Sequence, residues 1–261
     1  GRDNPTIDAG IKPAYGSIGD YVWSDNNNDG QQTVGELPLS GVKVYLYNGA
    51  GTVKLDSTFT NNIGLYIFDS LSTGVYRVKF VSPTGTIASK QNLGNDLSDS
   101  DANTKGWSQI VNINTALLPS DTLRNNPNVD AGFVPVGSLG DYVFKDTNGD
   151  GIQNTGDTPI SGLKVYLLNS STGAKLDSTL TDINGKYLFD SLLAGTYKVK
   201  FVIPSGSEAT TKGAGADTAK DSNINLDGTT DAVTIDTTLP VGNIGRDNPT
   251  IDAGIKPAYG S

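Results

Sequence analysis

Residues 16–48 have the sequence GSIGDYVWSDNNNDGQQTVGELPLSGVKVYLYN, and residues 137–169 have the sequence GSLGDYVFKDTNGDGIQNTGDTPISGLKVYLLN. The two stretches are identical at 20 of 33 positions. Similarity at a fixed interval is the signature of repeated structural units. We therefore predict two domains of one kind, at residues 16–135 and 136–258.

A third, partial copy of the repeat lies at the start of the chain. Residues 1–17 are identical to residues 245–261. We interpret residues 1–15 as the last strand of a preceding repeat, and residues 259–261 as the start of a following one. Because the chain opens on Gly1 rather than Met, we also expect it to be cut from a longer precursor.

Alternation of apolar and polar residues predicts strands within each unit. The stretch VKVYLY at 42–47 places Val or Leu at every second position, and VYRVKF at 75–80 alternates in the same way. With 32 Gly and 12 Pro in the chain, turn signals separate such stretches throughout. Short strands with dense turns over about 120 residues predict an all-β fold of tandem Ig-like, two-sheet sandwiches.

Composition argues against catalysis. The 261 residues include no Cys, His or Met, which removes thiol nucleophiles, imidazole bases and Cys- or His-ligated zinc. All but two of the 28 acidic residues are Asp, a residue typical of turns and of loops that bind hard cations. The net charge of −9 argues against nucleic acid and anionic membranes as partners, and no apolar run is long enough to span a membrane. We predict that the chain is not an enzyme.

The segment after the first predicted strand of each unit matches the twelve-residue calcium loop of the EF-hand. Oxygen ligands are expected at positions 1, 3 and 5, a backbone carbonyl at 7 and a carboxylate at 12, with Gly at the sharp turn of position 6. In the first unit the predicted ligands are Asp25, Asn27, Asp29, the carbonyl of Gln31, and Glu36. In the second unit they are Asp146, Asn148, Asp150, the carbonyl of Ile152, and Asp157.

A polar turn built from Asp, Asn and Gly is the simpler interpretation of such a motif. Here position 12 is also acidic, and the whole pattern recurs at the same place in the second unit. We therefore predict Ca²⁺ as the cofactor. Because the flanking residues are strand-like rather than helical, we expect a structural calcium site and not a paired-helix sensor.

A second set of acidic residues lies later in each unit. In the first unit it comprises Asp96, Asp99 and Asp101, and in the second unit Asp217, Asp221 and Asn223. Asp20 and Asp141, on the first predicted strand of each unit, are candidates to complete it. A second calcium site and a solvated acidic loop both fit this pattern. Trp107 has no aromatic counterpart in the second unit, and we favour a core or edge position for it over an exposed contact.

Taken together, these motifs resemble the B-type domains of the serine-aspartate repeat surface adhesins. The residues that carry the resemblance are IGDYVWSDNNNDG, SGVKVYL, GVYRVKF and the terminal DAGF, and it covers essentially both units. The resemblance implies a calcium-stabilised, transthyretin-like (prealbumin-like) sandwich with more than one calcium ion per repeat. It also implies a role as a spacer between a ligand-binding tip and a bacterial cell surface.

Related repeats of collagen adhesins close a Lys–Asn isopeptide bond with the help of a Glu. The equivalent positions here hold Phe80 and Phe201, so we expect no such bond.

These observations predict an extracellular stalk module whose partners are the neighbouring repeats of the same chain. The alternative is a carbohydrate- or protein-binding sandwich, because acidic β-sandwiches often carry binding sites on their loops. The sequence does not identify an external ligand.

Overall fold

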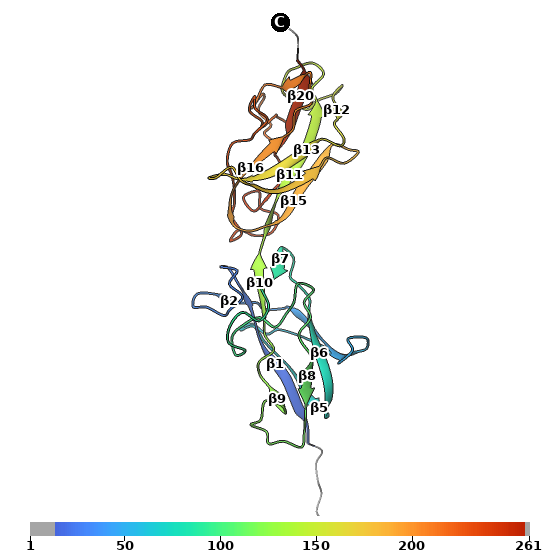
Figure 1. Ribbon diagram of the computed structural model, residues 1–261, viewed down its shortest axis with the longest axis vertical. Coiled ribbons are helices and arrows are strands. Elements are labelled where there is room, and N and C mark those ends of the chain that lie inside the picture. Colours follow the sequence, from blue (N-terminus) through green and yellow to red (C-terminus); the bar gives the residue numbers. More distant parts are fainter. Residues whose placement is uncertain (1–13, 259–261) are drawn as a thin grey trace, which may run out of the picture. The chain divides into compact units, whose positions relative to one another are not determined.

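The computed structural model describes residues 14–258, which form two units of β-structure. The first unit ends at Val134 and the second begins at Pro135. The proposed strand at residues 1–15 and the start of a further repeat at 259–261 lie almost entirely outside the described residues, so both interpretations stay predictions. All regular elements within residues 14–258 are strands, as predicted for an all-β chain (Figure 1).

Each unit contains ten strands. Those of the first unit are β1 Gly16–Ser24, β2 Leu37–Pro38, β3 Lys43–Asn48, β4 Lys54–Phe59, β5 Leu65–Leu71, β6 Gly74–Phe80, β7 Thr86–Ala88, β8 Val111–Ile113, β9 Asn125–Asn126 and β10 Ala131–Pro135. Those of the second unit are β11 Gly137–Lys145, β12 Thr158–Pro159, β13 Lys164–Asn169, β14 Lys175–Leu180, β15 Lys186–Leu192, β16 Gly195–Phe201, β17 Ser207–Ala209, β18 Val233–Ile235, β19 Asp247–Asn248 and β20 Ala253–Pro257.

The long strand β1 organises one of the two sheets of the first unit. Its first half pairs with β5 and, in parallel, with β9; its second half pairs with β2 and, in parallel, with β10. The other sheet has the order β4-β3-β6-β8. In the second unit β11 to β20 repeat these pairings strand for strand, so both units share one topology.

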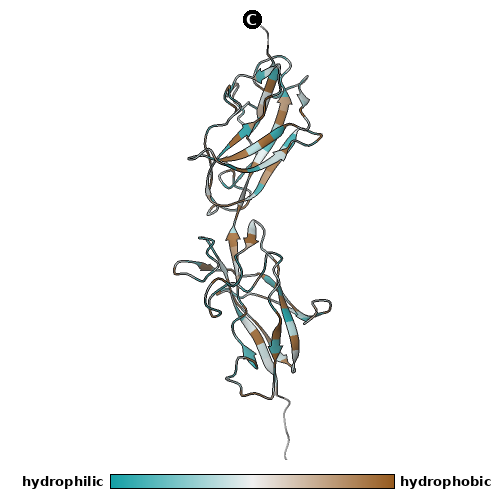
Figure 2. Ribbon diagram, in the orientation of Figure 1, coloured by the Kyte–Doolittle hydropathy of each residue, from teal (hydrophilic) through white to brown (hydrophobic). Residues whose placement is uncertain are grey.

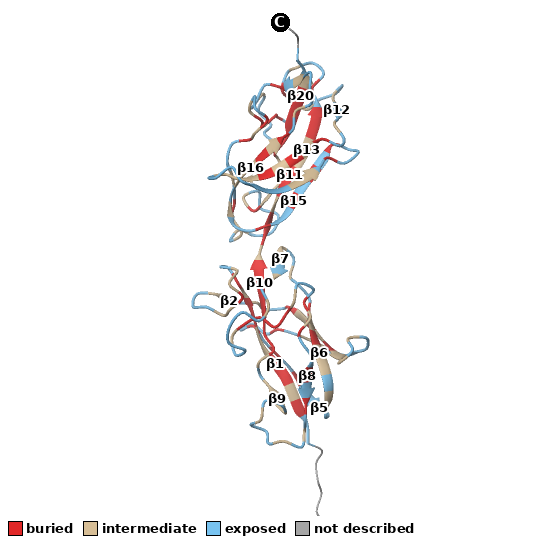
Figure 3. Cartoon of the chain, in the orientation of Figure 1, coloured by how far each residue is buried: buried red, intermediate tan, exposed pale blue. Residues whose placement is uncertain are grey.

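The core of each unit lies between its two sheets. In β3 the side chains of Val44 and Leu46 are buried, while the neighbouring Lys43, Tyr45 and Tyr47 are half-buried. β13 shows the same pattern. This alternation of buried and solvent-facing positions confirms the strand period expected from the sequence (Figures 2 and 3). Trp23 and Phe144 are completely buried at equivalent positions of β1 and β11.

A buried tyrosine links the core to the segment that leads into the last strand of each unit. The Tyr66 hydroxyl donates a hydrogen bond of 2.7 Å to the Val129 carbonyl oxygen, and Tyr187 donates one of the same length to Ile251. Since a buried hydroxyl without a partner is unfavourable, this bond fixes the chain at the residue before Asp130 or Asp252. The fold thereby determines the position of an aspartate that the sequence analysis did not assign to a site.

Candidate metal centre

The EF-type loop of the first unit is organised around the carboxylate of Asp25. This side chain is fully buried. Its Oδ2 accepts a hydrogen bond from the Gly30 N–H at 2.9 Å, and its Oδ1 accepts one from the Asp29 N–H at 3.2 Å. The loop is therefore folded around the residue that the motif assigns to position 1.

The glycine at position 6 is required by the backbone. Gly30 has φ +80°, and a Cβ at this residue would lie 2.6 Å from the Lys90 carbonyl oxygen. Gly151 in the second unit has φ +81°, and its Cβ would lie 2.3 Å from the Thr211 carbonyl oxygen. Only glycine meets both the left-handed conformation and the close approach of another chain segment.

The acidic residue at position 12 closes each loop. Glu36 accepts hydrogen bonds of 3.0 Å from the backbone N–H groups of Asn26 and Thr33. Asp157 accepts the equivalent bonds from Thr147 and Asn154, at 2.9 and 3.0 Å. The shorter aspartate therefore makes the same loop closure as the glutamate.

In the second loop Asp146 is fully buried and occupies the place of Asp25. Its carboxylate accepts hydrogen bonds from the N–H groups of Gly149 at 2.7 Å and Gly151 at 2.9 Å. The hydroxyl of Thr210, on a neighbouring segment, also donates to it. Asp150 accepts from the Ile152 N–H at 2.9 Å, as Asp29 does from the Gln31 N–H at 2.8 Å.

The second acidic segment lies directly beside the EF-type loop. Gln31, at position 7 of the loop, forms an antiparallel bridge with Asp99, and Ile152 forms the same bridge with Asp221. The Ser100 N–H also donates to the Gly30 carbonyl oxygen at 3.0 Å. The structure thus brings together two segments that the sequence analysis treated as separate candidates.

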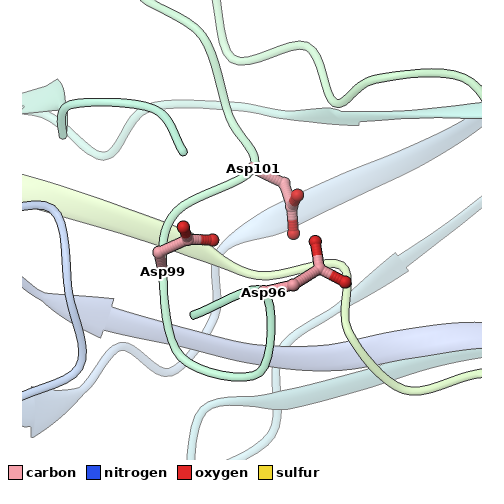
Figure 4. A group of neighbouring side chains, drawn as sticks. All are labelled: Asp96, Asp99 and Asp101. Carbon is pink, nitrogen blue, oxygen red and sulfur yellow. The ribbon is translucent and has the colours of Figure 1, made fainter. Parts of the chain in front are cut away.

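Within the second segment of the first unit, three carboxylates converge. Ligand atoms of Asp96, Asp99 and Asp101 lie within 4.8 Å of one another (Figure 4). Asp99 and Asp101 are buried, and Asp96 is exposed. Three carboxylate oxygens at this spacing match the donor set of a hard cation.

A fourth carboxylate, which the sequence did not predict as a ligand, joins this cluster from the residue directly before β10. Asp130 is fully buried, and its backbone N–H donates to Asp101 Oδ2 at 2.8 Å. Its Oδ1 accepts from the Tyr21 N–H at 2.9 Å, whereas its Oδ2 is buried without a hydrogen-bond donor. In the sequence this position is marked by the repeated Asp-Ala-Gly at residues 130–132 and 252–254.

The carboxyl groups of this cluster hold protons unusually strongly. Burial, and then the charge of Asp20, raise the pKa of Asp130 to about 8. Burial, with the charges of Asp96, Asp99 and Asp20, raises the pKa of Asp101 to about 7. Burial raises the pKa of Asp20 as well. Asp20 and Asp130 can share a hydrogen bond only when one of them is protonated, so the cluster needs either a proton or a cation.

The second unit has a less negative version of the same cluster. Asp252 is fully buried, neither of its carboxylate oxygens has a hydrogen-bond donor, and burial with the charge of Asp141 raises its pKa to about 8. Asn223 stands where the first unit has Asp101, and it donates to Asp221 at 3.1 Å. Lys186 forms an ion pair of 3.4 Å with Asp141. Asp217 is exposed and pairs with Lys220 at 3.6 Å.

These residues pass the chemical test for a divalent-cation site. Asp130 Oδ2 and both carboxylate oxygens of Asp252 are buried without donors, and the neighbouring acidic side chains Asp20, Asp101 and Asp141 offer oxygen ligands. Burying such a charge is strongly unfavourable unless a positive charge compensates it. A hard cation held by carboxylate oxygens supplies that compensation.

The positions that would carry an isopeptide-forming Glu are occupied by core phenylalanines. Phe80 and Phe201 are buried, and they pack edge-to-face on Tyr66 and Tyr187 with ring centroids 5.4 and 5.3 Å apart. Neither glutamate of the chain lies at these positions.

Comparison with known proteins identifies the repeated unit. The family model described as SdrD B-like domain matches residues 16–133 and again residues 137–255. The chain belongs to the SdrD B-like domain family. Both copies of the domain span the two sheets and the acidic clusters described above, so the resemblance inferred from the sequence motifs is confirmed.

The similar curated proteins are much longer than this chain. Serine-aspartate repeat-containing protein F of Staphylococcus epidermidis is 41% identical over 222 residues, which are 84% of this chain and 12% of that protein. Serine-aspartate repeat-containing protein D of Staphylococcus aureus (strain Newman) is 40% identical over 226 residues, 85% of this chain and 16% of that protein. A streptococcal ancillary pilin superposes with a TM-score of 0.34 and 12% identity, covering 96% of this chain and 64% of the pilin chain.

Membership of this family decides several of the broader predictions. SdrD B-like domains are non-enzymatic repeats of extracellular adhesins, so the predictions of a non-catalytic and extracellular chain are confirmed. Residues 14–258 contain no helix of the length and apolar character needed to cross a membrane.

Proposed function

We propose that the two SdrD B-like domains form a calcium-stabilised spacer within a cell-surface adhesin, with the neighbouring repeats of the chain as its structural partners. The observation that carries this proposal is the pair of buried carboxylates, Asp130 and Asp252, whose free oxygens have no donor. In the absence of a cation, each domain would enclose negative charge next to further carboxylates.

Each domain contributes two sets of ligands. The EF-type loops supply Asp25, Asn27, Asp29, the Gln31 carbonyl and Glu36, and, in the second domain, Asp146, Asn148, Asp150, the Ile152 carbonyl and Asp157. The adjoining clusters supply Asp20, Asp96, Asp99, Asp101 and Asp130, and, in the second domain, Asp141, Asp217, Asp221, Asn223 and Asp252. The bound cation supplies positive charge that offsets the mutual repulsion of these groups.

The physical consequence is mechanical as well as thermodynamic. The two sets of ligands in the first domain come from β1 and the loop after it, from the segment before β8 and from the residue before β10. A cation shared by these segments ties three distant parts of the chain together. This cross-linking would take the place of the isopeptide bond that Phe80 and Phe201 exclude.

Metal content tests the proposal. The chain is dialysed to equilibrium against a buffer with about 1 mM calcium, and bound calcium is measured by mass spectrometry as the excess of the element on the protein side of the membrane. We expect bound calcium that falls in both Asp25→Ala and Asp146→Ala variants, while Asp56→Ala, an exposed strand residue, leaves it unchanged. Absence of bound calcium in the unaltered chain under these conditions would refute the proposal.

A further inference from the structure

Five of the seven Lys and Arg residues between positions 14 and 135 lie at one sheet face, in a chain whose net charge is −9. Residues that are paired between neighbouring strands lie on the same face of a sheet. In the β4-β3-β6-β8 sheet, the pairings place one set of side chains on the face turned away from the core. We call this surface the cationic face, and it comprises Lys43, Tyr45 and Tyr47 of β3, Lys54 and Phe59 of β4, Arg77 and Lys79 of β6, and Lys105 and Trp107 of the segment between β7 and β8.

Aromatic rings hold these cations in place. Lys54 Nζ lies 5.2 Å from the centroid of the Tyr45 ring, and Lys43 Nζ lies 4.0 Å from the Phe59 ring. Trp107 contacts two cations, with Arg77 at 5.2 Å and Lys79 at 5.1 Å from its ring. Cation–π contacts of this kind restrict long side chains without neutralising them.

No carboxylate offsets this charge. All ion pairs of residues 14–258 lie in the second unit, so none involves a cation of this face. Asp56 of β4 pairs with the buried Leu46, which places it on the opposite side of the strand. Crowding is visible at Lys79, where burial and then the charge of Lys105 lower the pKa of the amine.

On the equivalent face of the second unit, aspartates lie near the lysines and offset their positive charge. Lys105 is replaced by Asp227, Gln109 by Asp231, Trp107 by Thr229 and Tyr47 by Leu168. Hydrogen bonds donated by Thr229, and to a smaller extent the positive charge of Lys200, lower the pKa of Asp227. Asp231 forms an ion pair of 2.7 Å with Lys212, and after that contact the charge of Lys198, the counterpart of Arg77, also lowers the pKa of Asp231. The uncompensated cationic face is therefore a property of the first unit.

From these contacts we infer that the cationic face of the first unit binds an acidic polysaccharide, a chain of sugars that carries sulfate or carboxylate groups. Four cations held against aromatic rings, with Lys105 beside Lys79, complement a polymer whose anionic groups repeat along its length. The negative charge on the rest of the chain does not prevent this contact, because charges more than about 10 Å away are largely screened at 0.1 M salt.

Two other anionic polymers fit this surface less well. Single-stranded nucleic acid is held by bases that stack on free aromatic faces, whereas the rings of Trp107 and Tyr45 are already occupied by cations. An acidic peptide that adds to a sheet needs an unpaired strand edge. β3 and β6 lie in the interior of this sheet and are paired on both sides.

Affinity for a sulfated polysaccharide tests the inference in the full 261-residue chain. Heparin binding is measured by isothermal titration in excess calcium at low and high salt, with neutral dextran, single-stranded DNA and poly-glutamate as comparison ligands. We expect salt-sensitive heparin binding that exceeds binding of all three comparison ligands. No heparin binding, or equally tight binding of DNA or poly-glutamate, would overturn the inference.

A matched pair of variants locates the surface. Lys54 and its counterpart Lys175 lie at 5.2 and 5.0 Å over equivalent tyrosine rings, one in each unit. We expect Lys54→Asp to weaken heparin binding roughly 3- to 10-fold, because it replaces a favourable charge contact with a repulsive one, and Lys175→Asp to change it less than about 2-fold. Lys105→Asp, which copies the residue of the second unit, should act like Lys54→Asp. Circular dichroism of each variant shows that the fold is kept. Equal losses in the two lysine variants would overturn the assignment to the first unit.

Discussion

The Asp101 carboxylate accepts a hydrogen bond of 2.8 Å from the backbone N–H of Asp130, a residue 29 positions later in the chain. The Asp101 N–H in turn donates to the Asp130 carbonyl oxygen at 2.9 Å. This reciprocal pairing places the two acidic side chains in one buried cluster. Because backbone hydrogen bonds between distant segments hold these carboxylates together, their repulsion arises wherever the domain is folded.

Replacing Asp130 by Asn should change the stability in opposite directions with and without calcium. In a chelator at about pH 9, above the pKa of about 8 that burial and the charge of Asp20 give Asp130, the neutral amide removes a buried charge. Its oxygen still accepts from the Tyr21 N–H, so we expect the first domain to melt roughly 2–6 °C higher. In excess calcium, loss of a charged ligand should lower its melting temperature by a similar amount. Scanning calorimetry of the variant in both conditions checks this, and Asp56→Asn serves as the exposed control. A shift of the same sign in both conditions would be inconsistent with Asp130 as a ligand.

Without calcium, stability should fall as the pH rises. Burial and neighbouring carboxylates raise the pKa of Asp101 to about 7, and those of Asp130 and Asp252 to about 8. In the unfolded chain these groups titrate near pH 3.9. Between these values the folded state binds more protons than the unfolded state, so its stability is full below about pH 4 and is lost progressively up to about pH 8.

Melting temperatures in a chelator at about pH 5 and about pH 8 measure this dependence. Excess calcium should reduce it, because the cation stabilises the ionised carboxylates. A chelated protein that is more stable at the higher pH would show that other groups control the titration.

The two EF-type loops should differ in affinity even though their closures look alike. Glu36 and Asp157 make equivalent hydrogen bonds, but the glutamate has one more methylene with which to bring both oxygens to an ion. Isothermal titration of Asp25→Ala, which leaves the second loop, and of Asp146→Ala, which leaves the first, compares them. We expect tighter calcium binding in Asp146→Ala, and the reverse order would be evidence against bidentate binding by Glu36.

Neither domain should contain an intramolecular isopeptide bond. Formation of a Lys–Asn bond releases one ammonia, and the positions of the required glutamate hold Phe80 and Phe201 in the core. The intact mass of the chelated protein should therefore equal that of its sequence. A deficit of one ammonia per domain would reveal a different catalytic residue.

The sequence was most informative where the relevant interactions are local. The strand alternation of residues 42–47 and the twelve-residue loop can both be read from neighbouring positions, and the structure places Val44 and Asp25 in buried sites accordingly. Asp130 was missed because its role depends on Asp101 and Tyr21, which are close only after the sheets have formed.

Trp107 illustrates the same limit. The sequence favours a core or edge position, and Trp107 does lie at the edge, where it bridges Lys79 on the side of β6 that pairs with β8. The sequence does not predict that its half-buried ring contacts Arg77 and Lys79. The bridge between Trp107 and Lys79 that places it there joins residues far apart in the sequence. A periodic sequence pattern cannot predict such a contact. The contact depends on which strands pair, and that pairing is determined by the rest of the fold.

Thermal unfolding of the unaltered chain, with and without calcium, tests whether the ion stabilises these domains. Extracellular calcium modules bind with dissociation constants of about 10⁻⁴–10⁻³ M, and a tenfold excess over that value stabilises the folded state by about 1.4 kcal/mol per site. For a domain of this size, that corresponds to a rise of roughly 3–6 °C per site. Calorimetry in EDTA and in about 10 mM calcium should therefore show both domains melting several degrees higher with the ion. Superimposable melting curves in the two conditions would contradict a stabilising role for calcium.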